Sequence, residues 1–218
     1  MTDQRPAPFF IADSLGLDFL NTLAIPVDTQ VEWIQSGEDL ISWLLEAGLV
    51  SSEIIAELRK GATAREFDAV AAQARKLREW FRGFVKAHKG KPLRAKALKE
   101  LKPLNSVLRR DEEFGQVVAR ETARKRSDRD DPPISRLVLS PRRRWRSPEA
   151  LLFPIAQAMA QAVCEENFRN VKACEGQRCA LMFVDRTRGR ARRWCSMSIC
   201  GNRAKQAAHR KRAMSARG

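Results

Sequence analysis

Residues 174–201 read CEGQRCALMFVDRTRGRARRWCSMSICG and hold four of the five cysteines in this 218-residue chain. The four form two pairs of equal internal spacing, Cys174-x4-Cys179 and Cys195-x4-Cys200, with fifteen residues between the pairs. Two ligands from each of two turns can close a tetrahedral shell of thiolates around one zinc ion. The spacing therefore predicts a metal site that joins two turns of the chain.

The residues between and after the pairs predict the elements that carry them. Residues 181–184 are apolar, 187–189 form a turn signal, and 192–194 are expected to return as the second strand of a β-hairpin. Residues 202–212 then predict a helix. A knuckle, a hairpin and a terminal helix describe a treble-clef-like zinc finger.

The four cysteines have three alternatives to structural zinc: an iron–sulfur cluster, a catalytic zinc and a chance arrangement. The hairpin and helix beside the cysteines favour zinc, and four protein ligands leave no open position for catalysis. A unit of about fifty residues has a marginal core, and structural zinc contributes on the order of 10 kcal/mol to the folding of such units. The fifth cysteine, Cys164, is expected to be a buried structural thiol outside the site.

The positive charge gathers at the C-terminal end. The formal net charge is +15, and residues 169–218 hold 14 Lys and Arg against two acids, so +12 falls on fifty residues and +3 on the rest. Such a balance points to nucleic acid or an anionic membrane, but the apolar side of the last helix is alanine and buries little area in lipid. With no signal peptide and no long apolar run, a cytoplasmic protein with reduced thiols is expected.

The basic residues supply candidates for nucleic-acid contact. Arginine suits phosphates and guanine edges because its fork is planar and bidentate. Three hairpin arginines alternate and would share a face if the strand extends that far. A basic tail that only confers solubility is the alternative, and Arg203 has a structural role as its own alternative. The candidates are Arg188, Arg190, Arg192, Arg193, Arg203, Lys205, Arg210 and Arg212.

The fold class expected for the whole chain is α+β. Residues 1–167 predict a mostly helical domain with a small β element, and 168–218 predict the finger. Helical periodicity and capping patterns predict helices over 17–23, 36–48, 51–61, 63–88, 93–108 and from 148 onward. Two β-branched stretches, 114–118 and 134–139, predict strands joined by a long polar loop.

Two parts of the chain resemble known families. Residues 174–212 closely resemble the CGNR zinc finger, whose name is spelled by residues 200–203, and the match includes Phe183, Asp185, Arg186 and Trp194. At the other end, LDFLNTL at 17–23 is similar to the signature of the ABATE domain, which precedes this finger in a family of bacterial stress-related transcription regulators. The middle of the chain matches only by length and position.

The resemblance implies a DNA-binding transcription regulator with one structural zinc, whose N-terminal domain senses a small-molecule effector or mediates assembly, for example as a homodimer. Asp18 and Asn21 lie three residues apart and could face a ligand, although a helix cap or a buried hydrogen bond would also explain them. An RNA- or ribosome-binding protein would use the same charges, but the aromatic residues between the first cysteine and the last helix, Phe183 and Trp194, are expected in the core of the finger.

An enzyme in the N-terminal domain is the remaining alternative. The chain has two histidines and no tyrosine, and we find no glycine-rich phosphate loop and no nucleophile motif. We therefore expect no catalytic residue.

Overall fold

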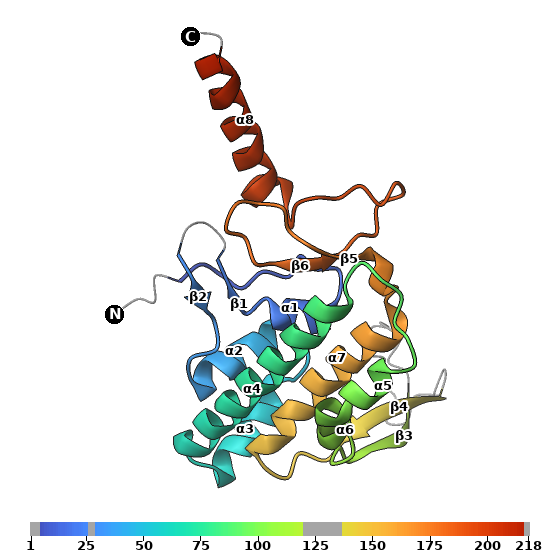
Figure 1. Ribbon diagram of the computed structural model, residues 1–218. Coiled ribbons are helices and arrows are strands. Elements are labelled where there is room, and N and C mark those ends of the chain that lie inside the picture. The colour runs from blue at the N-terminus through green and yellow to red at the C-terminus, as the bar shows by residue number, and fades with distance from the viewer. Residues whose placement is uncertain (1–4, 26–28, 120–136, 216–218) are drawn as a thin grey trace, which may run out of the picture.

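The computed structural model describes residues 5–25, 29–119 and 137–215 (Figure 1). The helices are α1 (Leu15–Leu20), α2 (Gly37–Glu46), α3 (Ser52–Gly61), α4 (Ala64–His88), α5 (Ala97–Glu100), α6 (Lys102–Leu108), α7 (Leu152–Glu165) and α8 (Asn202–Ser215). Three shorter helical turns are η1 (Pro148–Leu151), η2 (Phe168–Asn170) and η3 (Met197–Gly201). The α+β class, with a largely helical N-terminal part and a C-terminal finger, is confirmed.

The strands form three separate antiparallel pairs. They are β1 (Leu23–Ala24) with β2 (Val31–Glu32), β3 (Glu113–Ala119) with β4 (Leu137–Arg143), and β5 (Val171–Ala173) with β6 (Met182–Val184). The β3–β4 pair is the small β element that the sequence predicts, although residues 134–136 of the second predicted strand lie outside the described residues.

Local sequence signals explain where the long helices start. The Ser36 and Thr63 side chains each accept a hydrogen bond from the backbone N–H three residues later. The Asp39 and Glu66 carboxylates in turn accept one from the backbone N–H of the cap residue, so both predicted capping boxes are formed. The single helix predicted over 93–108 is instead two, because Pro103 has no amide to continue the first and starts α6.

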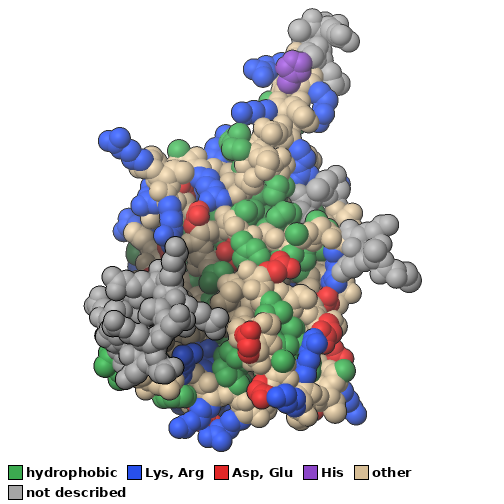
Figure 2. All heavy atoms as spheres, turned by 180° about the vertical axis from the view of Figure 1, so that it is seen from behind, with side chains coloured by type: hydrophobic (Ala, Val, Ile, Leu, Met, Phe, Trp, Pro, Cys, Tyr) green, Lys and Arg blue, Asp and Glu red, His purple; other side chains and the backbone are tan. Residues whose placement is uncertain are grey.

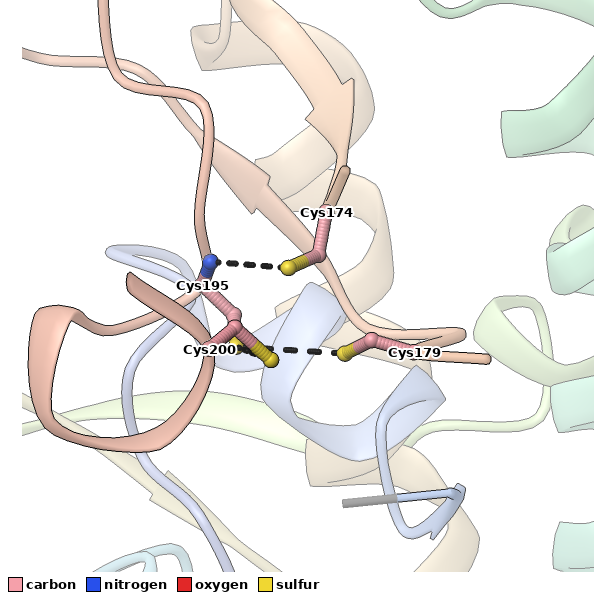
Figure 3. A group of neighbouring side chains, drawn as sticks. All are labelled: Cys174, Cys179, Cys195 and Cys200. Carbon is pink, nitrogen blue, oxygen red and sulfur yellow. Dashed lines mark hydrogen bonds between the residues drawn. The ribbon is translucent and has the colours of Figure 1, made fainter. Parts of the chain in front are cut away.

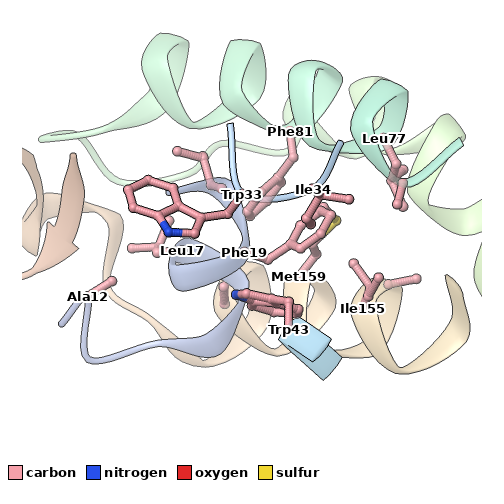
Figure 4. Packing of buried hydrophobic residues seen from close by; sticks show 14 of the residues in the cluster. Ala12, Leu17, Phe19, Trp33, Ile34, Trp43, Leu77, Phe81, Ile155 and Met159 are labelled. Atoms are coloured by element: carbon pink, nitrogen blue, oxygen red, sulfur yellow. The ribbon is translucent and has the colours of Figure 1, made fainter. Parts of the chain in front are cut away.

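The core lies between α1, α4 and α7 (Figure 4). Its buried side chains come from both ends of the chain; Phe19, Phe81 and Met159 are each fully buried. α1 can sit deep in this core because Gly16 brings its backbone against α7: a Cβ at Gly16 would lie 2.6 Å from the carbonyl oxygen of Ala158. The short N-terminal helix is therefore the centre of the helical body.

Substitution at Gly16 is predicted to test this packing. Gly16→Ala would force backbone atoms of α7 to move, so we expect a loss of about 1–3 kcal/mol in the free energy of unfolding. Gly83→Ala is the control, because Gly83 lies inside α4 with no atom within 4 Å of the added Cβ, and it should gain about 0.5–1 kcal/mol. Thermal or urea unfolding measures both, and equal effects of the two changes would contradict the packing of α1.

Cys164 differs from its expectation. It is exposed at the end of α7 rather than buried, because α7 turns Ile155, Met159 and Ala162 toward the core and Cys164 falls on the opposite side of the helix. In the described part of the chain, no helix is both long enough and apolar enough to cross a membrane.

The finger packs directly on the helical body. The amide of Val184 in β6 donates to the Ala12 carbonyl oxygen at 2.8 Å, and Phe183 and Leu181 join the same buried cluster as Leu17 and Leu20 of α1. α8 instead projects away from the rest of the molecule (Figure 1). The boundary near residue 167 remains a prediction, and the buried side chains on its two sides meet in one continuous core.

Candidate metal centre and nucleic-acid interface

The four predicted cysteine ligands lie together. Their sulfur atoms are all within 4.8 Å of one another, and Figure 3 shows the four side chains converging. Cys174 and Cys179 flank the turn between β5 and β6, while Cys195 precedes η3 and Cys200 lies within it. Two turns that are separate in the sequence therefore meet in the fold and supply two thiols each, as the sequence predicts.

The separations between sulfur atoms fit one tetrahedral ion. A zinc–sulfur bond of about 2.3 Å requires sulfur atoms roughly 3.8 Å apart in a tetrahedral shell. The Sγ atoms of Cys179 and Cys195 are 3.9 Å apart, and those of Cys195 and Cys200 are 3.6 Å apart. A disulfide would require about 2.05 Å, so the arrangement suits a metal.

The charge of the thiols leads to the same conclusion. Hydrogen bonds with the neighbouring thiols lower the pKa of Cys174 to about 2. The hydrogen bond between Cys179 and Cys174 raises the pKa of Cys179 to about 12. The pKa of Cys195 is raised for the same reason. Four groups this close can ionise together only beside a cation, so the donor set fits one divalent zinc ion with a structural role.

Backbone and side-chain donors surround the thiols. The amides of Cys195 and Gly176 donate to the Cys174 sulfur at 3.2 and 3.4 Å, and the Arg203 guanidinium donates to the Cys200 sulfur at 3.5 Å. A Cβ at Gly176 would lie 2.7 Å from that sulfur of Cys200, so only glycine fits between the two turns. Such donors orient the ligands and offset their negative charge.

The hairpin of the finger is formed by different strands from those expected. β6 pairs with β5, in the register Val171 with Val184, and residues 192–194 form no strand. The expected return strand was wrong because Val171–Ala173, which directly precedes Cys174, pairs with β6 instead. The first cysteine pair therefore sits at the tip of the hairpin.

Asp185 organises the loop that follows β6, a role the sequence analysis did not assign. Its buried carboxylate accepts hydrogen bonds from Lys172, the Thr187 amide and hydroxyl, and the amide of Arg192. Burial opposes ionisation, but these donors outweigh it and hold the pKa of Asp185 well below its usual range. The signal in the sequence was a single acid, Asp185, among the six arginines of residues 178–193.

Arg192 lies inward instead of in a row with Arg188 and Arg190. β6 ends at Val184, so the alternating face that would have aligned them does not form. The Arg192 guanidinium bonds the Asp13 carboxylate at 2.6 Å and the Ile11 carbonyl oxygen at 2.8 Å, and it stacks 4.2 Å from the Phe183 ring centroid. The Arg192 cation joins the finger to the body, so we do not include Arg192 among the proposed nucleic-acid contacts.

The other predicted contacts divide into two groups. In the loop, Arg188 is exposed, Arg190 bonds the Asp185 carbonyl oxygen, and Arg193 pairs with Glu175 at 2.6 Å. On the helix, Lys205, Arg210 and Arg212 are exposed, while Arg203 is half-buried beside the metal site. The exposed group on α8 is thus the larger part of the candidate interface.

Asp18 and Asn21, the possible ligand contacts, serve the junction between body and finger. The Asn21 amide donates to the Met182 carbonyl oxygen at 2.8 Å and accepts from the Met182 amide at 2.9 Å. One Asp18 oxygen accepts from the amides of Ile11 and Ala12, both at 2.9 Å. This is the buried-hydrogen-bond alternative, and it leaves the Asn21 amide occupied by β6.

The stability of the junction is predicted to depend on pH through Asp18. Burial raises its pKa to about 6, so its contribution is fully present below pH 4 and is lost as the pH rises through 6. The Asp18→Asn substitution removes this titration. The free energy of unfolding of the variant, relative to that of the parent, should therefore rise by about 1–3 kcal/mol as the pH is raised from 4 to 7. The free energy of unfolding of both proteins, measured across that pH range with exposed Glu57→Gln as the control, tests the prediction. A difference between variant and parent that does not change with pH would contradict it.

Family models match nearly the whole chain. The ABATE family, described as "putative stress-induced transcription regulator", matches residues 13–166, and the CGNR zinc finger matches residues 170–213. No curated protein matches the chain significantly. The ABATE match spans the helical body, and the CGNR match contains the four clustered cysteines. The chain therefore belongs to the ABATE family and ends in a CGNR zinc finger.

Proposed function

We propose that this protein is a DNA-binding transcription regulator and that its zinc finger makes the contact with DNA. The observation that carries the proposal is α8, a basic helix that stands away from the body. All side chains from Lys205 to Arg210 are exposed, and Figure 2 shows basic groups along the projecting part of the molecule.

The exposure of α8 is unusual for a helix of its composition. Helices of about 14 residues are marginal in water by themselves and usually depend on an apolar face packed in the protein. On the alanine side of α8, Ala207 and Ala208 are exposed and Ala204 is half-buried. A helix of this diameter, with small residues and cations at its surface, fits the major groove of duplex DNA.

The zinc site supplies the rigid base that such a helix needs. Cys200 lies in η3, which leads directly into α8 at Asn202, so a zinc ion bound there would hold the start of the helix in place. The Arg192 contacts and the Asn21–Met182 pair fix the same finger to the body. DNA contact at α8 is therefore mechanically connected to the N-terminal part.

Selection of genomic fragments by the purified full-length protein tests the proposal. We expect enrichment of duplex DNA, with an affinity that falls as salt rises. Changing Lys205, Arg210 and Arg212 together to Gln should flatten the log–log salt dependence by roughly two to three units. A control with Lys91, Lys99 and Arg169 changed to Gln removes the same charge from residues outside α8. Selection of RNA alone, or equal binding by the two triple variants, would refute the proposal.

The N-terminal body is proposed to carry the effector-sensing role. The support is a hollow of about 740 Å³ at the junction, where Ile11 and Asp13 of the body face Arg193, Trp194 and Met197 of the finger. A molecule in this hollow would contact both parts and bias how firmly the finger is held. Assembly as a homodimer stays a prediction.

A further inference from the structure

The finger contains a second hollow, which lies between the zinc knuckle and α8. It is a groove of about 440 Å³ whose knuckle wall is formed by Gly176, Gln177 and Arg178, and Cys200 lies at its base. The wall on the helix side is formed by Arg203, Ala204, Gln206, Ala207 and Arg210. None of the residues lining the groove is acidic.

The helix wall is one face of α8. Residues 203, 206, 207 and 210 follow the three- and four-residue spacing that places side chains on the same side of a helix. Residues 205, 208, 209 and 212 follow the same spacing on the opposite side. α8 thus presents two faces of different surroundings: one looks across the groove at the knuckle, and the other looks away from it.

We propose that the groove binds a phosphodiester backbone of duplex DNA. The inference rests on the proposed function and assigns a role to one face of α8. When a helix lies in the major groove, a sugar–phosphate strand runs along each side of it. The hollow beside α8 is where one strand would pass, between Arg178 of the knuckle and Arg210 of the helix.

The chemistry of the lining supports a phosphate ligand. Arginine forks and glutamine amides donate to phosphate oxygens, and the small residues Gly176, Ala204 and Ala207 let a backbone approach closely. Arg203 has a second task, because it also donates to the Cys200 sulfur. The groove test therefore uses Arg178 and Arg210, which are not metal ligands.

Binding of full-length variants to the selected DNA and to single-base variants of it tests the proposal. Arg178→Ala and Arg210→Ala should each flatten the log–log salt slope by about 0.9 and weaken all sequences equally. Arg169→Ala, exposed in η2, is the charge-matched control and should leave both the salt slope and the affinity unchanged. Zinc content and melting temperature confirm that each variant is folded.

The outcomes separate the two proposals. If the parent binds DNA but Arg178→Ala keeps the salt slope of Arg169→Ala, the groove holds no phosphate and the inference fails. It also fails if Arg210→Ala changes the preference at one base position instead of weakening all sequences equally. If the parent binds no duplex DNA, or binds RNA only, the proposed function itself is refuted.

Discussion

Cys200→Ser is expected to empty the metal site and unfold the finger. A serine hydroxyl stays protonated and cannot replace a thiolate as the fourth ligand, so the ion loses its closed shell. Structural zinc contributes on the order of 10 kcal/mol to units of this size, which makes this the largest single effect anticipated in the chain. Metal analysis of protein purified without added zinc should give one ion per chain for the parent and a large loss for the variant.

Two readouts locate the effect. Limited proteolysis should cut the variant between residues 174 and 201, and the melting temperature of the body should fall because the finger shares its core. Cys164→Ser is the control, since Cys164 is exposed and outside the cluster, and it should retain full zinc and parent stability. Full zinc occupancy in Cys200→Ser would overturn the assignment.

Asn21→Asp is expected to detach the finger from the body while leaving the metal bound. The carboxylate would lose the donor to the Met182 carbonyl oxygen and would place a buried negative charge against that oxygen. Unsatisfied or charged groups in such a position cost about 2–5 kcal/mol. Hydrogen exchange at the amides of β5 and β6 measures the loosening, and zinc content should remain at one per chain.

The pH provides an internal check on Asn21→Asp. Below pH 4 the introduced carboxyl is protonated and can donate again, so the loss of protection should shrink. Asn105→Asp, on the exposed surface of α6, is the matched control and should leave exchange in the finger unchanged. Parent-level protection of the Met182 amide in Asn21→Asp at pH 7 would show that this pair does not hold the finger.

Signals carried by residues close in the chain were read correctly from the sequence. The zinc ligands follow from two short, equal spacings, and the starts of α2 and α4 follow from capping boxes that span four residues each. The basic character of the C-terminal end follows from counting charges. None of these depends on which distant segment a residue finally meets.

Only the tertiary structure decided the partners. The apolar run in β6 could have paired with either flanking segment, and it took β5 because the finger folds against α1. Asn21 meets Met182, 161 residues away, and Arg192 turns inward to Asp13 while Arg188 stays exposed. Local patterns cannot distinguish one arginine of a basic stretch from the next. The difference arises from acceptors on Ile11 and Asp13 that only the folded chain brings within reach of Arg192.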